Sequence, residues 1–136
     1  MTVDGHADLP RRVIEEVINA GNLDAADEIF APNYIINGNP GRGQGPGLVK
    51  RATAAYRSAF TDLRVTIEDQ LVSGDKVVTR ERWTGVHTGT FNGIEPTGRT
   101  VIGTAITIDR IENVQIVERW SNGNYHEVLH QLQGDA

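Results

Sequence analysis

The sequence predicts one α+β domain in which helices come first and a meandering sheet follows. Apolar residues recur at helical spacing as far as Phe60, and from Leu63 onward they alternate with polar residues at period two. A chain of 136 residues suits a single domain with its own core. Helices followed by consecutive strands are typical of an α+β domain, and we expect the sheet to curl around the helices.

The N-terminal part is expected to form two helices. The first spans residues 8–20 and ends at Gly21. Its apolar face consists of four β-branched residues: Val13, Ile14, Val17 and Ile18. The second is short, is capped by Asn22 or Asp24, and runs through Phe30.

A third helix is expected after a glycine-rich loop. Residues 34–37 form a short extended segment, residues 38–47 the loop, and residues 48–60 the helix. The loop lacks the Gly-Lys-Ser/Thr ending of a phosphate-binding P-loop. We therefore expect it to be a lid over a pocket.

Four strands are expected in the second half of the chain: residues 63–71, 76–87, 100–111 and 115–120. Turns at Ser73-Gly74-Asp75 and Glu112-Asn113 and a longer connection join them. A short C-terminal helix then packs on the sheet through its apolar residues, Tyr125, Val128, Leu129 and Leu132.

Composition excludes several classes of function. The net charge is −5, and the 13 Lys and Arg residues are scattered, which argues against nucleic acid as a partner. The chain has no cysteine, so disulfides and thiolate catalysis are excluded. No apolar run is long enough to span a membrane. We expect a cytoplasmic protein without membrane contact.

One local pattern is typical of zinc proteases. His126-Glu127-x-x-His130 places two imidazoles one helical turn apart with a carboxylate between them. No His or Glu that could serve as a third ligand follows His130, and the other histidines are His6 and His87. The sequence therefore favours an amphipathic terminal helix over a metal site, and we expect no metal.

Six segments in order carry a family resemblance: 22–34, 54–69, 74–78, 85–89, 96–99 and 116–120. They resemble the SnoaL-like polyketide cyclases of the NTF2-like (ketosteroid-isomerase-like) superfamily, over residues 10–132. The resemblance implies a cone of curved antiparallel sheet wrapped around three N-terminal helices, closed by a short C-terminal helix. It also implies a deep apolar pocket, no cofactor and a homodimer.

The resembled cyclases use an aspartate a few residues after the last-strand tryptophan, and this chain has Asn124 there. An amide cannot transfer a proton near neutral pH but can donate a hydrogen bond to an enolate or carbonyl oxygen. The related limonene-epoxide-hydrolase-like enzymes use an Asp-Arg-Asp set. Its nearest counterparts here are Arg82, Thr84 and Asn122, so neither carboxylate is retained.

Three other residues are candidates for proton transfer. His87 is the only histidine on a predicted strand, and the alternative is a hydrogen-bonded residue that shapes the hairpin. Glu118 is a base if its face of the strand is concave, and otherwise a salt-bridge partner of Arg80 or Arg82. Asp69 is a base on an apolar stripe or the solvent-exposed end of its strand.

The sequence thus predicts a cofactor-independent cyclase or isomerase acting on a hydrophobic polyketide-like or terpenoid-like molecule. Alternatives are an epoxide hydrolase or hydroxylase-type member of the superfamily, and a non-catalytic ligand-binding module. The expected catalytic residues are His87, Glu118, Asp69 and Asn124. The expected substrate-binding residues are Tyr34, Asn37, Tyr56, Arg82, Trp83, Trp120 and Asn122.

Overall fold

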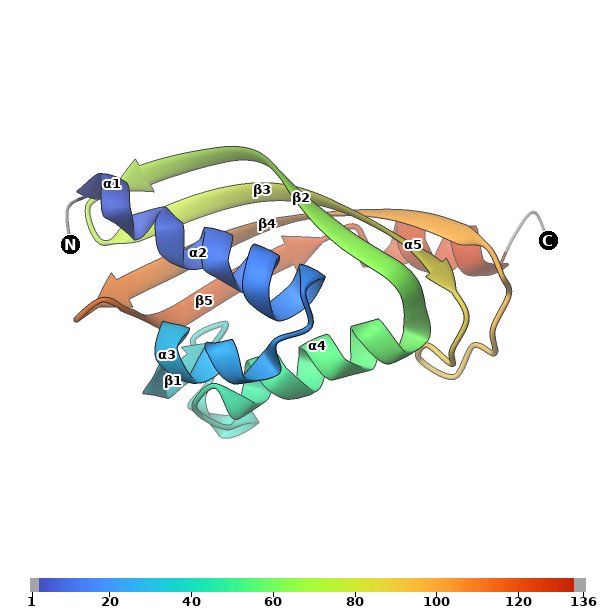
Figure 1. The fold of residues 1–136 in the computed structure, drawn as a ribbon, viewed down its shortest axis with the longest axis horizontal. Helices are drawn as coiled ribbons and strands as arrows, with labels where there is room; N and C mark the ends of the chain where they lie inside the picture. The colour runs from blue at the N-terminus through green and yellow to red at the C-terminus, as the bar shows by residue number, and fades with distance from the viewer. Residues whose placement is uncertain (1–2, 134–136) are drawn as a thin grey trace.

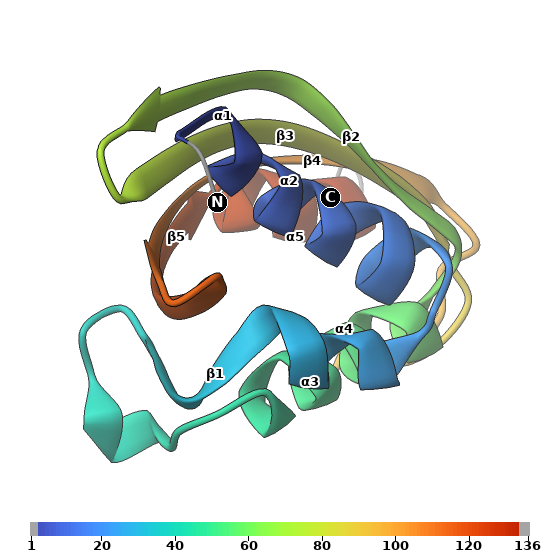
Figure 2. The ribbon, with the colours of Figure 1, turned by 60° about the vertical axis from the view of Figure 1, so that its left-hand side comes forward.

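A curved five-stranded sheet, in the order β1-β5-β4-β3-β2, wraps around the N-terminal helices in this computed structural model, which describes residues 3–133 (Figures 1 and 2). The strands are β1 (Phe30–Ile36), β2 (Phe60–Ser73), β3 (Lys76–His87), β4 (Thr100–Glu112) and β5 (Gln115–Gly123). The predicted α+β class and its curved sheet are confirmed.

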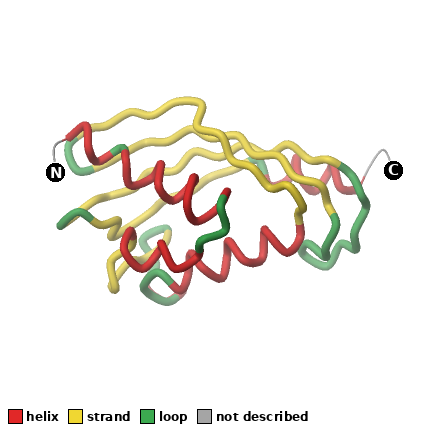
Figure 3. The backbone as a smooth tube through the Cα atoms, in the orientation of Figure 1, coloured by secondary structure: helices red, strands yellow, loops and turns green. Residues whose placement is uncertain are grey.

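Most of the helices pack on the concave side of the sheet (Figure 3). They are α1 (Val3–His6), α2 (Asp8–Arg12), the π-helical η1 (Val13–Asn19), the 3₁₀ turn η2 (Leu23–Ala25), α3 (Ala26–Ile29), the 3₁₀ turn η3 (Pro40–Arg42), α4 (Gly47–Ala59) and α5 (Tyr125–Gln133). Elements α2 and η1 together cover the predicted first helix, whose second half has the wider π-helical turn. In the described part of the chain, no helix combines the length and apolar character that crossing a membrane requires.

β1 is longer than predicted and runs parallel to β5, whereas the other neighbouring strands pair antiparallel. The strand begins at Phe30, which is fully buried, and Tyr34 is 1% exposed on the same strand. Both side chains belong to the larger core cluster with η1, α3 and β5. Burial of these aromatic residues explains why the chain is already extended at Phe30, the residue at which the predicted second helix was expected to end.

A β-bulge in β2 reverses the faces of that strand. The register with β3 shifts between Ile67 and Asp69. Leu63 and Val65 therefore lie on the concave side, whereas Leu71 is 63% exposed. Alternation along the strand predicts that every second residue from Leu63 to Leu71 lies on one face. This prediction is wrong beyond Ile67, because the extra residue of the bulge inverts the alternation.

Side-chain amides hold the helices to strand edges. Asn19 at the end of η1 bonds both the N–H and the C=O of Val65. Gln131 of α5 does the same for Ile102, on the part of β4 that extends beyond its pairing with β5. These amides supply the hydrogen bonds that a neighbouring strand would otherwise provide.

Candidate functional site

A cavity of about 250 Å³ lies between the helices and the concave face of the sheet. Val13 and Ile18 of η1 and Val49 and Tyr56 of α4 line one side. Residues of β1 to β5 line the other, and the wall is mainly apolar. A ligand that enters this cavity therefore leaves water for a largely apolar environment.

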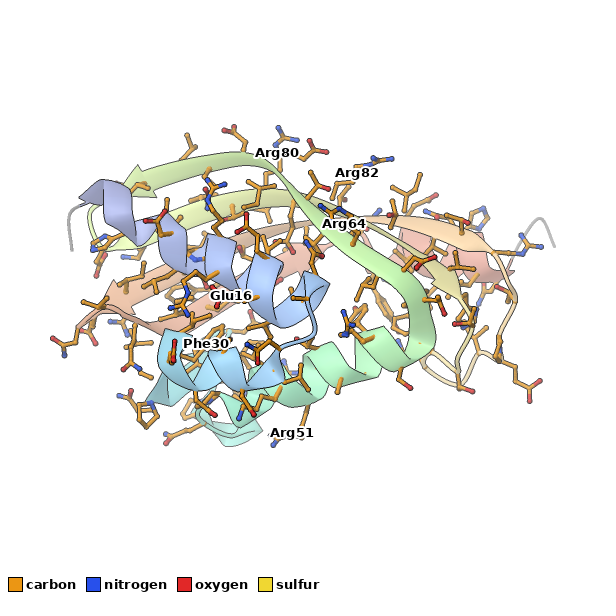
Figure 4. All side chains as sticks on the ribbon, in the orientation of Figure 1. Glu16, Phe30, Arg51, Arg64, Arg80 and Arg82 are labelled. Atoms are coloured by element: carbon orange, nitrogen blue, oxygen red, sulfur yellow. The ribbon has the colours of Figure 1, made fainter. Side chains whose placement is uncertain are left out.

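Strand β3 delivers a carboxylate and an indole to the cavity. Glu81 and Trp83 face inward and line it, whereas Arg80 and Arg82 point away from the helices (Figure 4). The alternation follows from the period of two in a strand and from Val77, which is fully buried on the inner face.

A buried ion pair lies beside the cavity. Arg119 of β5 and Asp109 of β4 are opposite each other in the ladder. Arg119 Nε donates to Asp109 Oδ1 at 2.5 Å, and Nη2 donates to Oδ2 at 3.1 Å. Asp109 is fully buried, and the Arg119 guanidinium also lies 5.4 Å from the ring centre of Phe30. The bidentate pair fixes the guanidinium, and its Nη1 has no partner in residues 3–133.

Glu81 is an unpaired carboxylate in this cavity. None of the described residues forms a hydrogen bond or ion pair with it. Burial raises the pKa of Glu81, the positive charge of Arg119 opposes the increase, and Asp109 adds to it. A carboxyl group with a raised pKa can exchange protons closer to neutral pH than an ordinary glutamate can.

Tyr34 brings a hydroxyl group to the same cavity. Its side chain packs edge-on against Phe30, with ring centres 4.7 Å apart, and lines the wall. Burial raises the pKa of Tyr34, although Arg119 lowers it somewhat. Within the described chain the hydroxyl has no hydrogen-bond partner, so it is available as a donor.

Aromatic side chains form the opposite part of the wall. Tyr56 and Trp83 both line the cavity, with their rings 5.7 Å apart and edge-to-face. Phe60 packs behind Trp83 at 5.2 Å. This arrangement of rings suits a flat apolar ligand body.

The structure places Tyr34, Tyr56 and Trp83 in the cavity wall, as the sequence predicts. The other predicted site residues lie elsewhere: His87, Glu118, Asp69, Asn124, Asn37, Arg82, Trp120 and Asn122. The glycine-rich residues 38–47, expected to form a lid, also contribute nothing to the wall.

His87 is fully buried at the far end of β3. Its Nδ1 accepts a hydrogen bond from the N–H of Thr97 and lies 3.0 Å from the hydroxyl oxygen of the same residue. Its ring packs against Phe60 at 5.6 Å. These contacts match the alternative reading of His87 as a residue that shapes the connection to β4.

Glu118 and Trp120 lie on the outer face of β5, because Arg119 between them faces inward. Glu118 accepts two hydrogen bonds from Arg110, each 3.3 Å long. The expected salt bridge therefore exists, but its partner is Arg110 instead of Arg80 or Arg82. Asp69 is exposed because the bulge in β2 turns it outward.

The amides have structural contacts. Asn124 accepts a hydrogen bond from the N–H of Thr104 through Oδ1 and donates its own N–H to the C=O of Thr104. Asn37 accepts a bond from the N–H of Ser121. Asn122, Asn124 and Arg82 instead border an outer hollow of about 530 Å³, which is larger than the cavity but is walled mostly by exposed side chains.

The metal pattern of the C-terminal helix is exposed to solvent. His126 and His130 lie on the outside of α5. Over residues 3–133 the structure contains no group of three or more His, Asp or Glu side chains that could hold a metal ion.

Sequence reasoning missed Glu81, Asp109 and Arg119. A signal for the ion pair was present, because an acid and an arginine lie on the two strands joined by the turn at Glu112-Asn113, Asp109 three residues before Glu112 and Arg119 four residues after its ladder partner Gln115. No such signal existed for Glu81, since alternation alone does not say which face of β3 is concave.

Comparisons with known proteins agree with this fold. The family model described as SnoaL-like polyketide cyclase matches residues 9–132. TsrD from Streptomyces laurentii is 26% identical, with a TM-score of 0.88 over 97% of both chains. IdmH from Streptomyces antibioticus, a proposed polyketide cyclase, is 27% identical, with a TM-score of 0.80 over 95% of this chain and 99% of its own.

AclR from Streptomyces galilaeus, a proposed hydroxylase, is 21% identical, with a TM-score of 0.84 over 97% of this chain and 83% of its own, and shows the fold alone. A search of curated proteins found no match.

Proposed function

Because this chain belongs to the SnoaL-like polyketide cyclase family, we propose that it is a cofactor-independent enzyme that transfers protons on a small hydrophobic carbonyl compound bound in the cavity. The observation that carries the proposal is the unpaired Glu81 carboxylate in an apolar cavity beside a fixed arginine. The likeness to IdmH supports a polyketide-like substrate and ring closure.

Glu81 acts as the base. Its carboxylate takes a proton from the carbon next to a carbonyl group, and the electron pair of the broken C–H bond forms an enolate. Arg119 Nη1 and the Tyr34 hydroxyl donate hydrogen bonds to the enolate oxygen. Because Asp109 fixes the guanidinium, these donors need little reorganisation as the charge develops.

The enolate then has two outcomes. Its carbon attacks a second carbonyl group of the same molecule, closing a ring, and Glu81 returns the proton to the new alkoxide. Alternatively, Glu81 returns the proton to another carbon, which isomerises the molecule. Both outcomes consume no cofactor, because every proton and electron pair stays within substrate and enzyme.

Epoxide opening is the second candidate. The charges of both Asp109 and Glu81 raise the pKa of Arg119, so one arginine and two carboxyl groups interact in this site. Protonated Glu81 would give its proton to the epoxide oxygen as the C–O bond breaks and water attacks the carbon, and the ionised carboxylate would then take up the proton that the attacking water loses. Incorporation of labelled oxygen from water into the diol of a cyclic epoxide, such as indene oxide, would distinguish this reaction from enolate chemistry.

The test is proton exchange on a model ketone. We expect the protein to accelerate deuterium uptake by 2-tetralone in D₂O, followed by NMR, and Glu81→Gln to reduce that acceleration about 10²–10⁴-fold. The rate should rise with pH through an inflection above the ordinary glutamate value of about 4.3. Glu118→Gln is the matched comparison on the outer face, and we expect it to retain the rate.

Two results would contradict the proposal. A wild-type protein that binds 2-tetralone without accelerating exchange would favour the non-catalytic binding module. Loss of exchange in Glu118→Gln, with retention in Glu81→Gln, would move the base to the residue that the sequence pattern suggested.

A further inference from the structure

Gly103 lies directly opposite Trp83 in the ladder between β3 and β4. The Trp83 indole occupies the space above the glycine. A Cβ atom at position 103 would lie 2.1 Å from Trp83 Nε1 and 2.2 Å from Cε2. Such distances are far shorter than a van der Waals contact, so this position of the indole requires glycine at 103.

Aromatic neighbours confine the indole on its other sides. Phe60 lies 5.2 Å from it and Tyr56 5.7 Å, both in edge-to-face geometry. Phe60 itself packs closely over Gly85, where an added Cβ would lie 2.8 Å from the Phe60 Cβ. A side chain at position 103 would therefore push the indole toward the space that remains, which is the cavity.

We propose that Gly103 is a specificity-determining residue, which lets the Trp83 indole lie against β4 and thereby sets the width of the cavity for flat ring systems. Gly103 itself is not part of the cavity wall. It acts through Trp83, which does line the cavity, and selects ligands by the size of their ring system. The inference rests on the proposed function in one respect, that the cavity is the ligand site, and is independent of the chemistry of Glu81.

The position of the indole can be measured directly. The chain has two tryptophans, so in a Trp120→Phe background the fluorescence comes from Trp83 alone. Adding Gly103→Ala should shift the emission maximum, because the indole leaves its contact with β4. Gly47→Ala is the matched control, since its Cβ would meet only the flexible Arg51 side chain, at 3.1 Å, and we expect it to leave the spectrum unchanged.

Ring-size selection is tested with phenol, 2-naphthol and 2-anthrol, titrated by quenching of Trp83 emission, or by calorimetry where Trp83 is replaced. Gly103→Ala should retain the affinity for phenol but lower the affinities for 2-naphthol and 2-anthrol about tenfold or more. Trp83→Phe should shift preference toward 2-anthrol. The double variant should regain 2-naphthol binding, because the smaller ring leaves room for the new methyl group.

The outcomes separate the two proposals. An unchanged ring-size preference in Gly103→Ala, or a loss that Trp83→Phe does not restore, would overturn the role of Gly103 and leave the proposed function intact. If Gly103→Ala does not fold, an unchanged ring-size preference in Trp83→Phe would overturn the proposed role of Gly103. Failure of all three phenols to bind the wild-type protein would overturn the cavity as the ligand site, and both proposals with it.

Discussion

Two arginine–carboxylate pairs join β4 to β5 at neighbouring positions, one on each face of the sheet. On the concave face, Arg119 donates hydrogen bonds to both carboxylate oxygens of Asp109, at 2.5 and 3.1 Å. On the outer face, Arg110 reaches a single oxygen of Glu118 at 3.3 Å and shares its charge with Glu112 at 3.2 Å. The pairs have the same chemistry and the same strands, and they differ in geometry and exposure.

The fold gives the two pairs different surroundings. The Asp109 side chain is fully buried and that of Arg119 is 15% exposed, against 13% and 27% for Glu118 and Arg110. Buried charges interact strongly and demand a fixed geometry, whereas solvent weakens the outer pair. Of the two arginines, only Arg119 lines the cavity. Its Nη1 has no hydrogen-bond partner in residues 3–133.

The largest contrast should appear in stability. Asp109→Asn removes the bidentate carboxylate partner of the buried Arg119 charge and should lower the free energy of unfolding by about 3–5 kcal/mol. Glu118→Gln should lower it by less, because the contacts of the outer pair are longer and Arg110 keeps Glu112 as a partner. Urea denaturation followed by circular dichroism measures both, and equal losses would show that the two pairs do not differ as described.

The next contrast concerns activity. Arg119→Lys keeps the charge but loses the planar fork, so we expect exchange of 2-tetralone to slow about 10²-fold. Arg110→Lys makes the same change on the outer face and should leave the rate unaltered. A similar loss in both variants would indicate that the effect travels through the strands instead of through contact with the ligand.

The smallest contrast concerns pH. Because burial raises the pKa of Glu81 in the folded protein, the folded state binds more protons than the unfolded state between the ordinary value and the raised one. Stability should therefore fall as pH rises through this window. Glu81→Gln removes that loss, so thermal unfolding should show the variant gaining stability relative to wild type near neutral pH and losing the gain at acidic pH. A constant difference across pH would contradict the raised pKa.

The sequence predicted most elements because their signals are local. The helical spacing of Val13 and Val17 and the period of two in β3 and β4 each depend on near neighbours along the chain. The family resemblance added the curvature of the sheet, which local patterns do not contain. The bulge at Ile67 and the parallel pairing of β1 escaped prediction, because both depend on partners distant in sequence.

The site was predicted less well than the fold, for a physical reason. Tyr34, Tyr56 and Trp83 were found because large aromatic residues line cavities as readily as they fill cores. Asn124 was chosen by its distance from Trp120 along the chain, and Glu118 because it shares a strand face with Trp120. Their neighbour Arg119 reaches the cavity because the side chains of a strand alternate between its faces.

The sequence by itself determined the α+β class and the residue types available for chemistry, because composition and periodicity are carried by the chain, and the resemblance of six segments indicated the family. Only the tertiary structure decided that the inner face of β3 bears Glu81 and that Arg119 meets Asp109. The face of a strand is set by what packs against it, and the inner side of this sheet exists only after it has curved around the helices.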